Sequence, residues 1–198
     1  MEDDVTKCST RELLVEVIGE QSTKALYTGG LRPLLSMEET GPRYTSVRLK
    51  RARRRLTAAR ELVKRCFEEQ LPNRDVMSSP QLVREYLQVH CAFLGHEVFA
   101  CMFLDSCNHV IAFEVMFRGT IDAAAVYPRE VVKTTLRHNA SGVIFAHNHP
   151  SGNAEPSQAD RVLTRRLTDA LALVEVRVLD HIVVGVEGTV SFAERGWL

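Results

Sequence analysis

The chain has 198 residues, of which 45% are hydrophobic and 25% are charged, and its 25 basic residues balance its 25 acidic ones. These values are ordinary for a soluble globular protein, and the length suits one core domain with a smaller module. Zero net charge argues against binding of polyanions over the whole surface, and the lack of an apolar run of about 18 residues argues against a membrane span.

Five cysteines occur at irregular spacings and form no CxxC motif, namely Cys8, Cys66, Cys91, Cys101 and Cys107. Neither a disulfide framework nor a thiolate zinc site is therefore indicated, and free thiols suit a reducing compartment. The acidic N-terminal residues, MEDDVTKC, precede no apolar run, so we expect no signal peptide. Together these features predict a cytoplasmic protein.

Residues 1–75 are predicted to form a small, basic, mostly helical module. Ser9 followed by Glu12 is typical of a capping box at the start of a helix. Apolar residues then recur at helical spacing, at Leu13, Leu14, Val17 and Ile18. Glycines and prolines interrupt the middle of the module, between Gly29 and Pro42.

A strongly basic segment, from Arg48 to Arg65, has nine lysines or arginines among its 18 residues. An apolar stripe along one helix face is expected there, at Leu49, Leu56, Ala59, Leu62 and Val63. Such a helix could bind the phosphate backbone of DNA without reading its sequence. Alternatively, it is a solvated helix balanced by nearby acidic residues, namely Glu38, Glu39, Glu68 and Glu69. The sequence leaves both interpretations open.

Residues 76–198 are predicted to form a second domain in which strands and helices alternate. After a short helix at 81–89, strands are expected at 97–104, 110–117, 143–146, 176–185 and 190–192, and helices at 129–137 and 157–174. The order is therefore β-β-α-β-α-β-β. It predicts an α/β or α+β fold with a mixed β-sheet flanked by helices.

The segment HNHPSGNAEPSQAD, residues 147–160, contains a candidate metal site. His147 and His149 lie two residues apart at the end of a predicted strand, so their side chains share one face. Asp160, at the start of the next helix, can supply a third ligand if the intervening loop brings that helix back over the strand end. A catalytic zinc ion takes three such ligands and leaves its fourth position for water.

A simpler interpretation of the same segment is the start of a helix. Ser157 and Asp160 have the spacing of a serine N-cap followed by an acidic residue. Two histidines separated by one residue are also a weak metal signal when taken alone. The two interpretations are compatible, because a cap of this kind could carry Asp160 to the two histidines.

The complete spacing, His-x-His, seven residues, Ser, two residues and Asp, resembles the JAMM motif of MPN-type metalloproteases. The segments RGTIDAAAVYPREVVKTTLRHNASGVIFAHNHPSGNAEPSQAD and LDHIVVG resemble the bacterial RadC-like branch of that family. The resemblance runs from about Ser78 to the C-terminus, some three-fifths of the chain.

The resemblance implies an MPN/JAB fold, which is cytidine-deaminase-like, and a Zn²⁺ centre. It implies that His147, His149 and Asp160 bind zinc. It also implies that Ser157 holds the substrate oxyanion, and that a glutamate on an upstream strand is the general acid/base. The implied reaction is hydrolysis of a peptide or isopeptide bond. Neither the substrate nor the oligomeric state follows from the motif.

Two strand glutamates compete for the role of general acid/base, Glu97 and Glu114. By strand alternation Glu97 shares a face with Phe99 and Phe103, where a carboxylate is costly unless it has a partner or a task. Glu114 has Arg118 nearby and the pattern of a half-solvated strand residue. In the RadC-like family the acid lies in the first strand of the domain, which also favours Glu97.

Other polar residues near the motif have two interpretations each. Asn148 and Asn153 could line the cleft, but loop asparagines usually satisfy turns. Asp180 and His181 could support the metal ligands from behind, although a buried, satisfied pair on a strand is the favoured interpretation. The remaining histidines near this domain have no ligand-like spacing to the motif, namely His90, His96, His109 and His138.

RadC-like proteins usually carry a helix-hairpin-helix module that contacts DNA phosphates. Here TGP at 40–42 resembles a remnant of its hairpin, but Tyr44 and Thr45 stand where a second glycine is expected. The alternative function is a DNA-associated protein whose metal domain acts as a scaffold or as a nuclease. The intact ligand set favours the hydrolase, since one carboxylate and two histidines suit attack on an amide better than a two-metal phosphodiester site.

Overall fold

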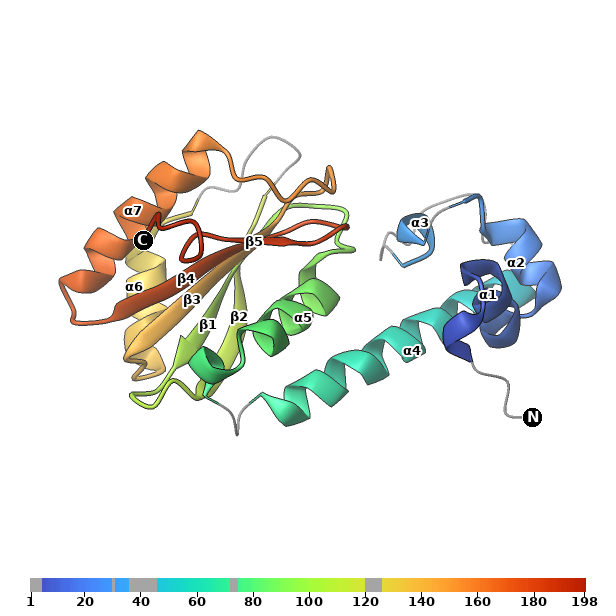
Figure 1. Cartoon of the computed structure of the whole chain (residues 1–198), viewed down its shortest axis with the longest axis horizontal. Coiled ribbons are helices and arrows are strands. Elements are labelled where there is room, and N and C mark those ends of the chain that lie inside the picture. Colours follow the sequence, from blue (N-terminus) through green and yellow to red (C-terminus); the bar gives the residue numbers. More distant parts are fainter. Residues whose placement is uncertain (1–4, 30, 36–45, 72–74, 120–125) are drawn as a thin grey trace. The chain divides into compact units, whose positions relative to one another are not determined.

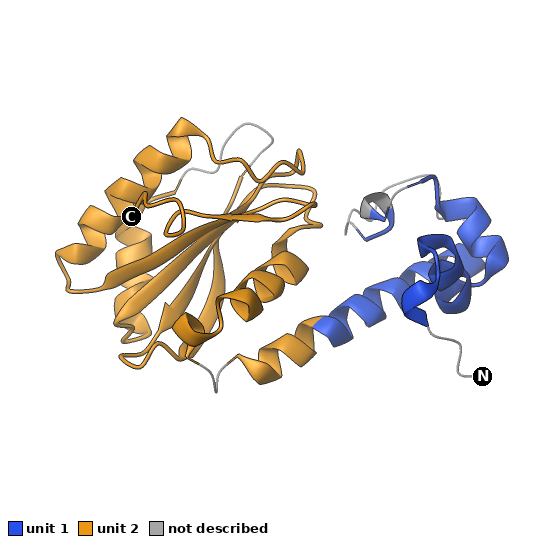
Figure 2. Ribbon diagram, in the orientation of Figure 1, with its two compact units in different colours: residues 1–63 blue, residues 64–198 orange. Residues whose placement is uncertain are grey.

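The computed structural model describes residues 5–29, 31–35, 46–71, 75–119 and 126–198. The chain divides into two compact units, residues 1–63 and residues 64–198 (Figure 2). The division falls within the long helix α4 (Val47–Gln70), which therefore contributes residues to both units. Within the described ranges, every helix is too short or too polar to cross a bilayer.

The first unit is helical, as the sequence predicts. The predicted capping box is confirmed, because Ser9 Oγ accepts a hydrogen bond from the Glu12 amide and the Glu12 carboxylate accepts one from the Ser9 amide. The described elements are η1 (Val5–Lys7), α1 (Thr10–Ile18), α2 (Glu20–Leu26), α3 (Arg32–Leu35) and the first part of α4. A small core joins them, consisting of Leu14, Ile18, Leu26, Leu34, Ala52 and Leu56.

The apolar stripe predicted along α4 is only partly correct. Leu56 is buried and Leu49 is half-buried, but Ala59, Leu62 and Val63 are exposed. The small core of the first unit takes in only two buried side chains from α4, as far as the described residues show. The part of α4 after Leu56 therefore leaves the remaining side chains of the predicted stripe exposed to solvent.

The basic side chains of α4 differ in their contacts. Arg55 and Arg60 donate hydrogen bonds to backbone carbonyls of the first unit, at 3.5 and 2.8 Å, and so help to pack the helix. Exposed basic side chains on the same helix include Lys50, Arg51 and Arg54. Binding of DNA through α4 stays a prediction, and it now centres on this exposed set. The TGP segment, Tyr44 and Thr45 lie outside the described residues.

The second unit contains a mixed sheet whose strands have the spatial order β2-β1-β3-β4-β5 (Figure 1). Neighbouring strands are antiparallel except β3 and β4, which are parallel and are connected through α7 (Gln158–Ala172). The strands are β1 (Val98–Leu104), β2 (Val110–Arg118), β3 (Gly142–Asn148), β4 (Arg177–Val184) and β5 (Thr189–Ser191). With η3 (Val76–Ser78), α5 (Pro80–Cys91) and α6 (Pro128–Arg137), the predicted order of elements is confirmed.

Helices cover both faces of this sheet (Figure 1). On one face, Leu87 of α5 packs in a core that includes Met102 of β1. On the other face, Leu167 of α7 packs in a second core with Phe145 of β3, and α6 contributes to the same core. Since side chains alternate along a strand, His147 points to the same face as Phe145, toward α7.

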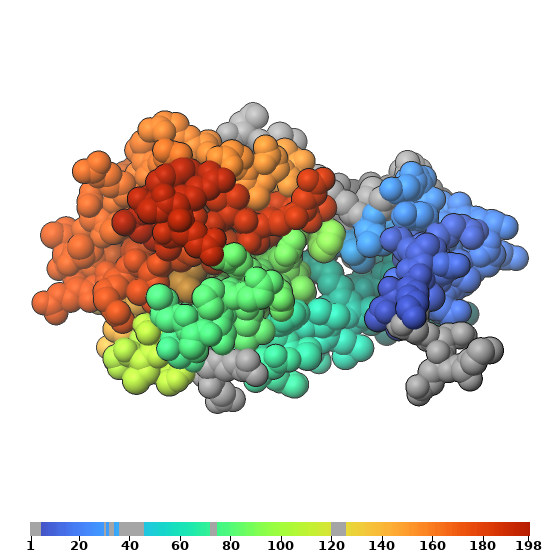
Figure 3. Space-filling model, viewed as in Figure 1, coloured from blue at the N-terminus to red at the C-terminus, as the bar shows by residue number. Residues whose placement is uncertain are grey.

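The residues after β5 lie at the surface beside α7, as the space-filling view shows (Figure 3). Trp197 is the main contact, because the guanidinium of Arg161 on α7 lies 3.4 Å from its ring centroid and that of Arg195 lies 4.8 Å from it. Arg195 also pairs with Glu155 through N–O distances of 2.5 and 2.7 Å. These contacts tie the C-terminal segment to the loop and helix that follow β3.

Candidate metal centre

The start of β1 and the end of β3 lie side by side. Phe99 of β1 pairs with His147 of β3 in the antiparallel register. Continuing that register by two residues brings Glu97, just before β1, next to His149, just after β3. The candidate acid and the two candidate histidine ligands therefore occupy the same end of the sheet, although about fifty residues separate them in sequence.

Asn148 links these two strand ends. Its Oδ1 accepts a hydrogen bond from the Val98 amide at 2.8 Å, and its Nδ2 donates one to the carbonyl of His96 at 3.1 Å. Asn148 is fully buried. Asn148 is the last residue of β3 and not a loop residue, so the expected role in a turn is wrong. Its side chain instead bonds the backbone on both sides of Glu97.

His147, His149 and Asp160 converge on one point. His147 Nε2 lies 3.0 Å from His149 Nε2 and 3.3 Å from Asp160 Oδ1, and His149 Nε2 lies 3.6 Å from Asp160 Oδ2. The side chain of His147 is only 2% exposed, whereas those of His149 and Asp160 are 20% and 14% exposed. The group therefore lies at the edge of the core, with His147 buried and the other two side chains partly accessible to solvent.

Asp160 reaches the histidines because α7 starts with a capping box. Ser157 Oγ accepts a hydrogen bond from the Asp160 amide at 3.2 Å, and Asp160 Oδ2 accepts one from the Ser157 amide at 2.7 Å. The Ser157 hydroxyl donates to the same Oδ2 at 2.7 Å. The predicted cap is therefore confirmed, and it turns the carboxylate toward the histidines, as the metal interpretation requires.

Two glycines shape the loop between β3 and α7. Gly152 has a φ of 93°, in the left-handed region that favours glycine. A Cβ atom on Gly185, after β4, would lie 2.4 Å from the carbonyl oxygen of Gly152, which is far too close. The absence of a side chain at Gly185 therefore lets the loop that begins with His149 lie against the turn between β4 and β5.

The three candidate ligands are electrostatically coupled. Burial opposes ionisation of Asp160, but the imidazoles of His147 and His149 beside it outweigh burial and hold the pKa of that carboxyl well below its usual range. The hydrogen bond with Asp160 raises the pKa of His149 against the effect of burial, and the negative charges of Asp160 and Glu97 act in the same direction. The site therefore favours positive charge next to its carboxylate.

Each histidine of the group has a partner for its second ring nitrogen. His149 Nδ1 lies 2.8 Å from the carbonyl oxygen of Asn153, and His147 Nδ1 lies 2.8 Å from His181 Nε2. The other nitrogen of His181 lies 2.6 Å from Thr164 Oγ1 on α7. Partners of this kind fix the tautomer and orientation of histidines that bind metals.

His181 and its neighbour Asp180 have different roles. Complete burial holds the pKa of His181 well below its usual range. Asp180 instead accepts hydrogen bonds from the Ser191 hydroxyl at 2.6 Å and the Ala193 amide at 3.0 Å, which fastens β5. The favoured interpretation, a buried and satisfied pair, is wrong for His181, because this side chain contacts the candidate ligand His147. Asp180 is satisfied by its own hydrogen bonds but is only half-buried. Thr164 was not among the predicted site residues, because nothing in its helical spacing distinguishes it.

The donor set fits a zinc ion. Zinc prefers imidazole nitrogen and carboxylate oxygen, and a catalytic site with three protein ligands keeps a fourth position open. Two imidazole nitrogens and one carboxylate oxygen, on a group that is partly exposed, provide that combination. His147, His149 and Asp160 are the residues that would hold the ion.

The two candidate glutamates lie in different surroundings. Glu97 is half-buried at the start of β1, beside His149 by register. Glu114 on β2 instead bonds Arg137 at 2.8 Å and His138 at 2.6 Å. Burial opposes ionisation of Glu114, but these partners lower the pKa of its carboxyl. Glu114 is thus held in an ion pair, a neighbourhood that differs from the one expected around Arg118.

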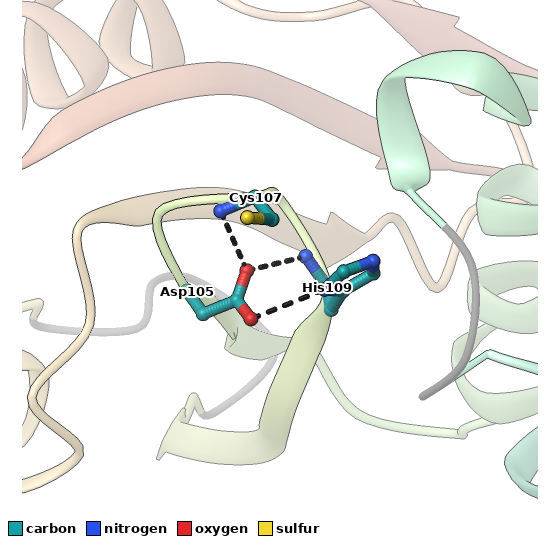
Figure 4. Close-up of side chains that lie close together, drawn as sticks. All are labelled: Asp105, Cys107 and His109. Atoms are coloured by element: carbon teal, nitrogen blue, oxygen red, sulfur yellow. Dashed lines mark hydrogen bonds and ion pairs between the residues drawn. The ribbon is translucent and has the colours of Figure 1, made fainter.

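A second group of metal-binding residue types lies in the turn between β1 and β2 (Figure 4). It consists of Asp105, Cys107 and His109. The hydrogen bonds of the turn explain this cluster: Asp105 Oδ1 accepts from the amides of Cys107 and His109, each at 2.8 Å, and Oδ2 faces His109 Nδ1 at 3.2 Å. The carboxylate is occupied by its own turn, so the proximity of the three side chains needs no metal.

Comparison with known proteins matches the sheet and its helices to one family. The family model for the RadC-like JAB domain matches residues 77–197, which is more than half of the chain. The chain belongs to this family. The RadC-like JAB domain match begins in η3, so α1, α2 and α3 of the first unit lie before it.

Relatives of this RadC-like JAB domain chain carry the name UPF0758 protein. The one from Cellvibrio japonicus (strain Ueda107) is 53% identical over 174 residues, covering 86% of this chain and 76% of the relative. The one from Paracidovorax citrulli (strain AAC00-1) is 47% identical over 188 residues, covering 94% and 79%. The match to the protein of Ectopseudomonas mendocina (strain ymp), 57% identical over 143 residues, covers 72% of this chain and 64% of the relative. The chain thus spans less than two thirds of that protein.

Proposed function

We propose that the chain is a zinc-dependent metallopeptidase or isopeptidase that hydrolyses an amide bond. The observation that carries this proposal is the convergence of His147, His149 and Asp160, whose ligand atoms all lie within 4.8 Å of one another. When bound there, zinc would lower the pKa of its water to about 7 and polarise the substrate carbonyl. The JAB family match supports the same reaction class.

Glu97 is the proposed general acid/base. It lies next to His149 by strand register, and its charge acts on that imidazole. Its carboxylate would take a proton from the attacking water and give a proton to the leaving amine. Glu114 is less suited to this task, because its carboxylate is already held by Arg137 and His138.

Ser157 is proposed to stabilise the oxyanion of the substrate by donating a hydrogen bond. Its hydroxyl donates to Asp160 Oδ2 at 2.7 Å in the described structure, so it would have to turn toward the substrate oxygen. The backbone amide of Ser157 also donates to that Oδ2, and this bond would keep α7 capped while the hydroxyl moves. The same serine can therefore serve the helix and the reaction in turn.

The experiment compares Glu97→Gln with Glu114→Gln in the full chain. Wild type should contain one zinc ion by elemental analysis and should cleave at least one member of a panel of fluorogenic peptides and isopeptide-linked lysines. Glu97→Gln should keep the zinc and lose the activity by about 100-fold or more, the usual contribution of general acid–base catalysis. Glu114→Gln should keep both.

Three results would count against this proposal. Full activity in Glu97→Gln would reject the acid/base assignment. Absence of bound metal from wild type would reject the metal centre. Metal-dependent nicking of DNA without amide hydrolysis would favour the alternative, a DNA-associated protein with a nuclease site.

A further inference from the structure

A continuous chain of buried hydrogen bonds runs from His147 to the backbone of Asp160. His147 Nδ1 lies 2.8 Å from His181 Nε2, and His181 Nδ1 lies 2.6 Å from Thr164 Oγ1. The Thr164 hydroxyl in turn donates to the carbonyl oxygen of Asp160 at 2.6 Å. His147, His181 and Thr164 are each at most 2% exposed, so solvent does not compete for these bonds. The chain begins at one candidate ligand and ends on the backbone of another.

The carbonyl at the end of this chain fixes the direction of every bond in it. A carbonyl oxygen only accepts, so the single hydrogen of the Thr164 hydroxyl points to Asp160. Thr164 Oγ1 must then accept from His181, which places the ring proton of His181 on Nδ1. A neutral imidazole has one N–H, so His181 Nε2 accepts and His147 donates through Nδ1. His147 Nε2 is left with a lone pair.

We propose that Thr164 and His181 are positioning residues that set the tautomer of His147 for metal binding. A metal ion bonds to the unprotonated ring nitrogen, and the partner of the other nitrogen decides which one that is. The unprotonated Nε2 of His147 is the atom that faces His149 Nε2 at 3.0 Å and Asp160 Oδ1 at 3.3 Å. The inference rests on the proposed metal centre and assigns roles to two residues outside the ligand set.

The two candidate histidine ligands each donate through Nδ1, but their acceptors differ. His149 donates its Nδ1–H directly to the carbonyl oxygen of Asn153. His147 reaches a carbonyl through two intervening side chains, one on β4 and one on α7. Because that carbonyl belongs to Asp160, the tautomer of one ligand depends on the helical turn that carries another.

The test uses the full chain and the substitution Thr164→Val, which removes the hydroxyl and keeps the branched shape. The affinity for Zn²⁺, titrated against a competing chelator, should fall by about 10- to 100-fold, as is usual when an outer hydrogen-bond partner is lost. Thr164→Ser keeps the hydroxyl and should restore the affinity. Thr168→Val is the matched control, because Thr168 makes the same bond one turn later, to the carbonyl of Thr164 at 2.9 Å.

Nitrogen-15 NMR of the imidazole rings gives a readout that needs neither activity nor zinc. Protonated and unprotonated ring nitrogens have distinct shifts, so each tautomer can be assigned. In the metal-free wild-type chain, His147 and His181 should both carry their proton on Nδ1. In Thr164→Val the Nδ1–H of His181 loses its acceptor, so the Nδ1–H population of His147 should fall. Thr168→Val should leave it unchanged.

The outcomes separate this inference from the proposed function. A wild type that binds no zinc, but whose two histidines have the expected tautomers, would reject the metal centre and retain the hydrogen-bond order. A wild type with His181 protonated on Nε2, or a folded Thr164→Val variant with wild-type zinc affinity, would overturn the inference and leave the metal centre standing. Thermal unfolding shows whether the variants fold. If Thr164→Val does not fold, the tautomers of His147 and His181 in wild type test the inference alone.

Discussion

Two groups of three side chains in this protein have the composition of metal ligands, and they differ in how they are built. His147, His149 and Asp160 come from the end of β3 and the start of α7. Asp105, Cys107 and His109 come from one turn of five residues. In both groups the ligand atoms lie within 4.8 Å of one another. Residue type and proximity therefore do not distinguish them.

The difference lies in what else the side chains bind. In the first group, the ring nitrogens that point away from the shared centre have partners, namely the Asn153 carbonyl and His181. In the turn group, the Asp105 carboxylate accepts from amides of the turn itself. A candidate site is therefore better judged by the supports around its ligands than by the ligands alone.

The largest expected effect is on metal content. His147→Ala removes the most buried of the three proposed ligands, so zinc in the purified chain should fall from one equivalent to a level near the background. The double change Cys107→Ser and His109→Ala should leave one equivalent in place, because the turn group needs no metal to explain its geometry. Elemental analysis of the three proteins measures both effects.

Two other patterns of zinc content would contradict this assignment of the metal to the group of His147, His149 and Asp160. Zinc that persists in His147→Ala and disappears in the double variant would assign the metal to the exposed turn. Two equivalents of zinc in wild type, falling to one in each variant, would mean that both groups bind zinc. The hydrogen-bond partners around the side chains would then not distinguish a metal site from a turn.

A smaller effect should come from the loop that positions His149. Gly185→Ala places a Cβ 2.4 Å from the carbonyl oxygen of Gly152, so the loop must shift. We expect a loss of stability of about 1–3 kcal/mol, as for other overpacked sites, and weaker zinc binding. Chemical denaturation and zinc titration measure these changes.

Gly188→Ala is the control for this substitution, because a Cβ at Gly188 would have no heavy atom within 4 Å. It should change neither stability nor zinc binding. Equal behaviour of the two alanine variants would show that the close approach at Gly185 does not hold the loop.

The smallest expected effect concerns the turn group and depends on pH. The backbone hydrogen bond from His109 holds the pKa of Asp105 below its ordinary value of 3.8, with burial opposing it. A folded-state pKa below the unfolded value gives stability that is present above about pH 3.8 and is lost as the pH falls further. Asp105→Ala should therefore lower the unfolding temperature by about 2–4 °C at pH 7, and by less at pH 3.

Cys107→Ser keeps the hydrogen bonds of the Asp105 turn and should leave the unfolding temperature unchanged at both pH values. A gap between wild type and Asp105→Ala that grows toward pH 3 would contradict the structural role of this carboxylate.

The sequence predicts correctly those features that depend only on residues close together in the chain. The capping box of Ser157 and Asp160 needs only a spacing of three residues, and it forms as predicted. The strands around Phe99 and Phe145 follow from short apolar runs. The family match extends over the same part of the chain.

Long-range pairing decides the features that the sequence left open. His181 meets His147 because β4 lies beside β3, and this register cannot be read from a run of letters. Thr164 joins them from α7, where a threonine has no distinguishing pattern. The exposed Leu62 and Val63 were misjudged for a related reason, since helical spacing shows that a stripe exists but not whether another element covers it.

The buried amide of Asn148 has a further consequence for which substitutions the core can accept. One side chain bonds the backbone on both sides of Glu97 and also sits between His147 and His149 in sequence. The separation between Glu97 and the two histidines is therefore fixed by the hydrogen bonds of a single buried amide as well as by the pairing of β1 with β3. A hydrophobic substitution in the core that leaves Asn148 in place should therefore leave the distance between Glu97 and His147 unchanged.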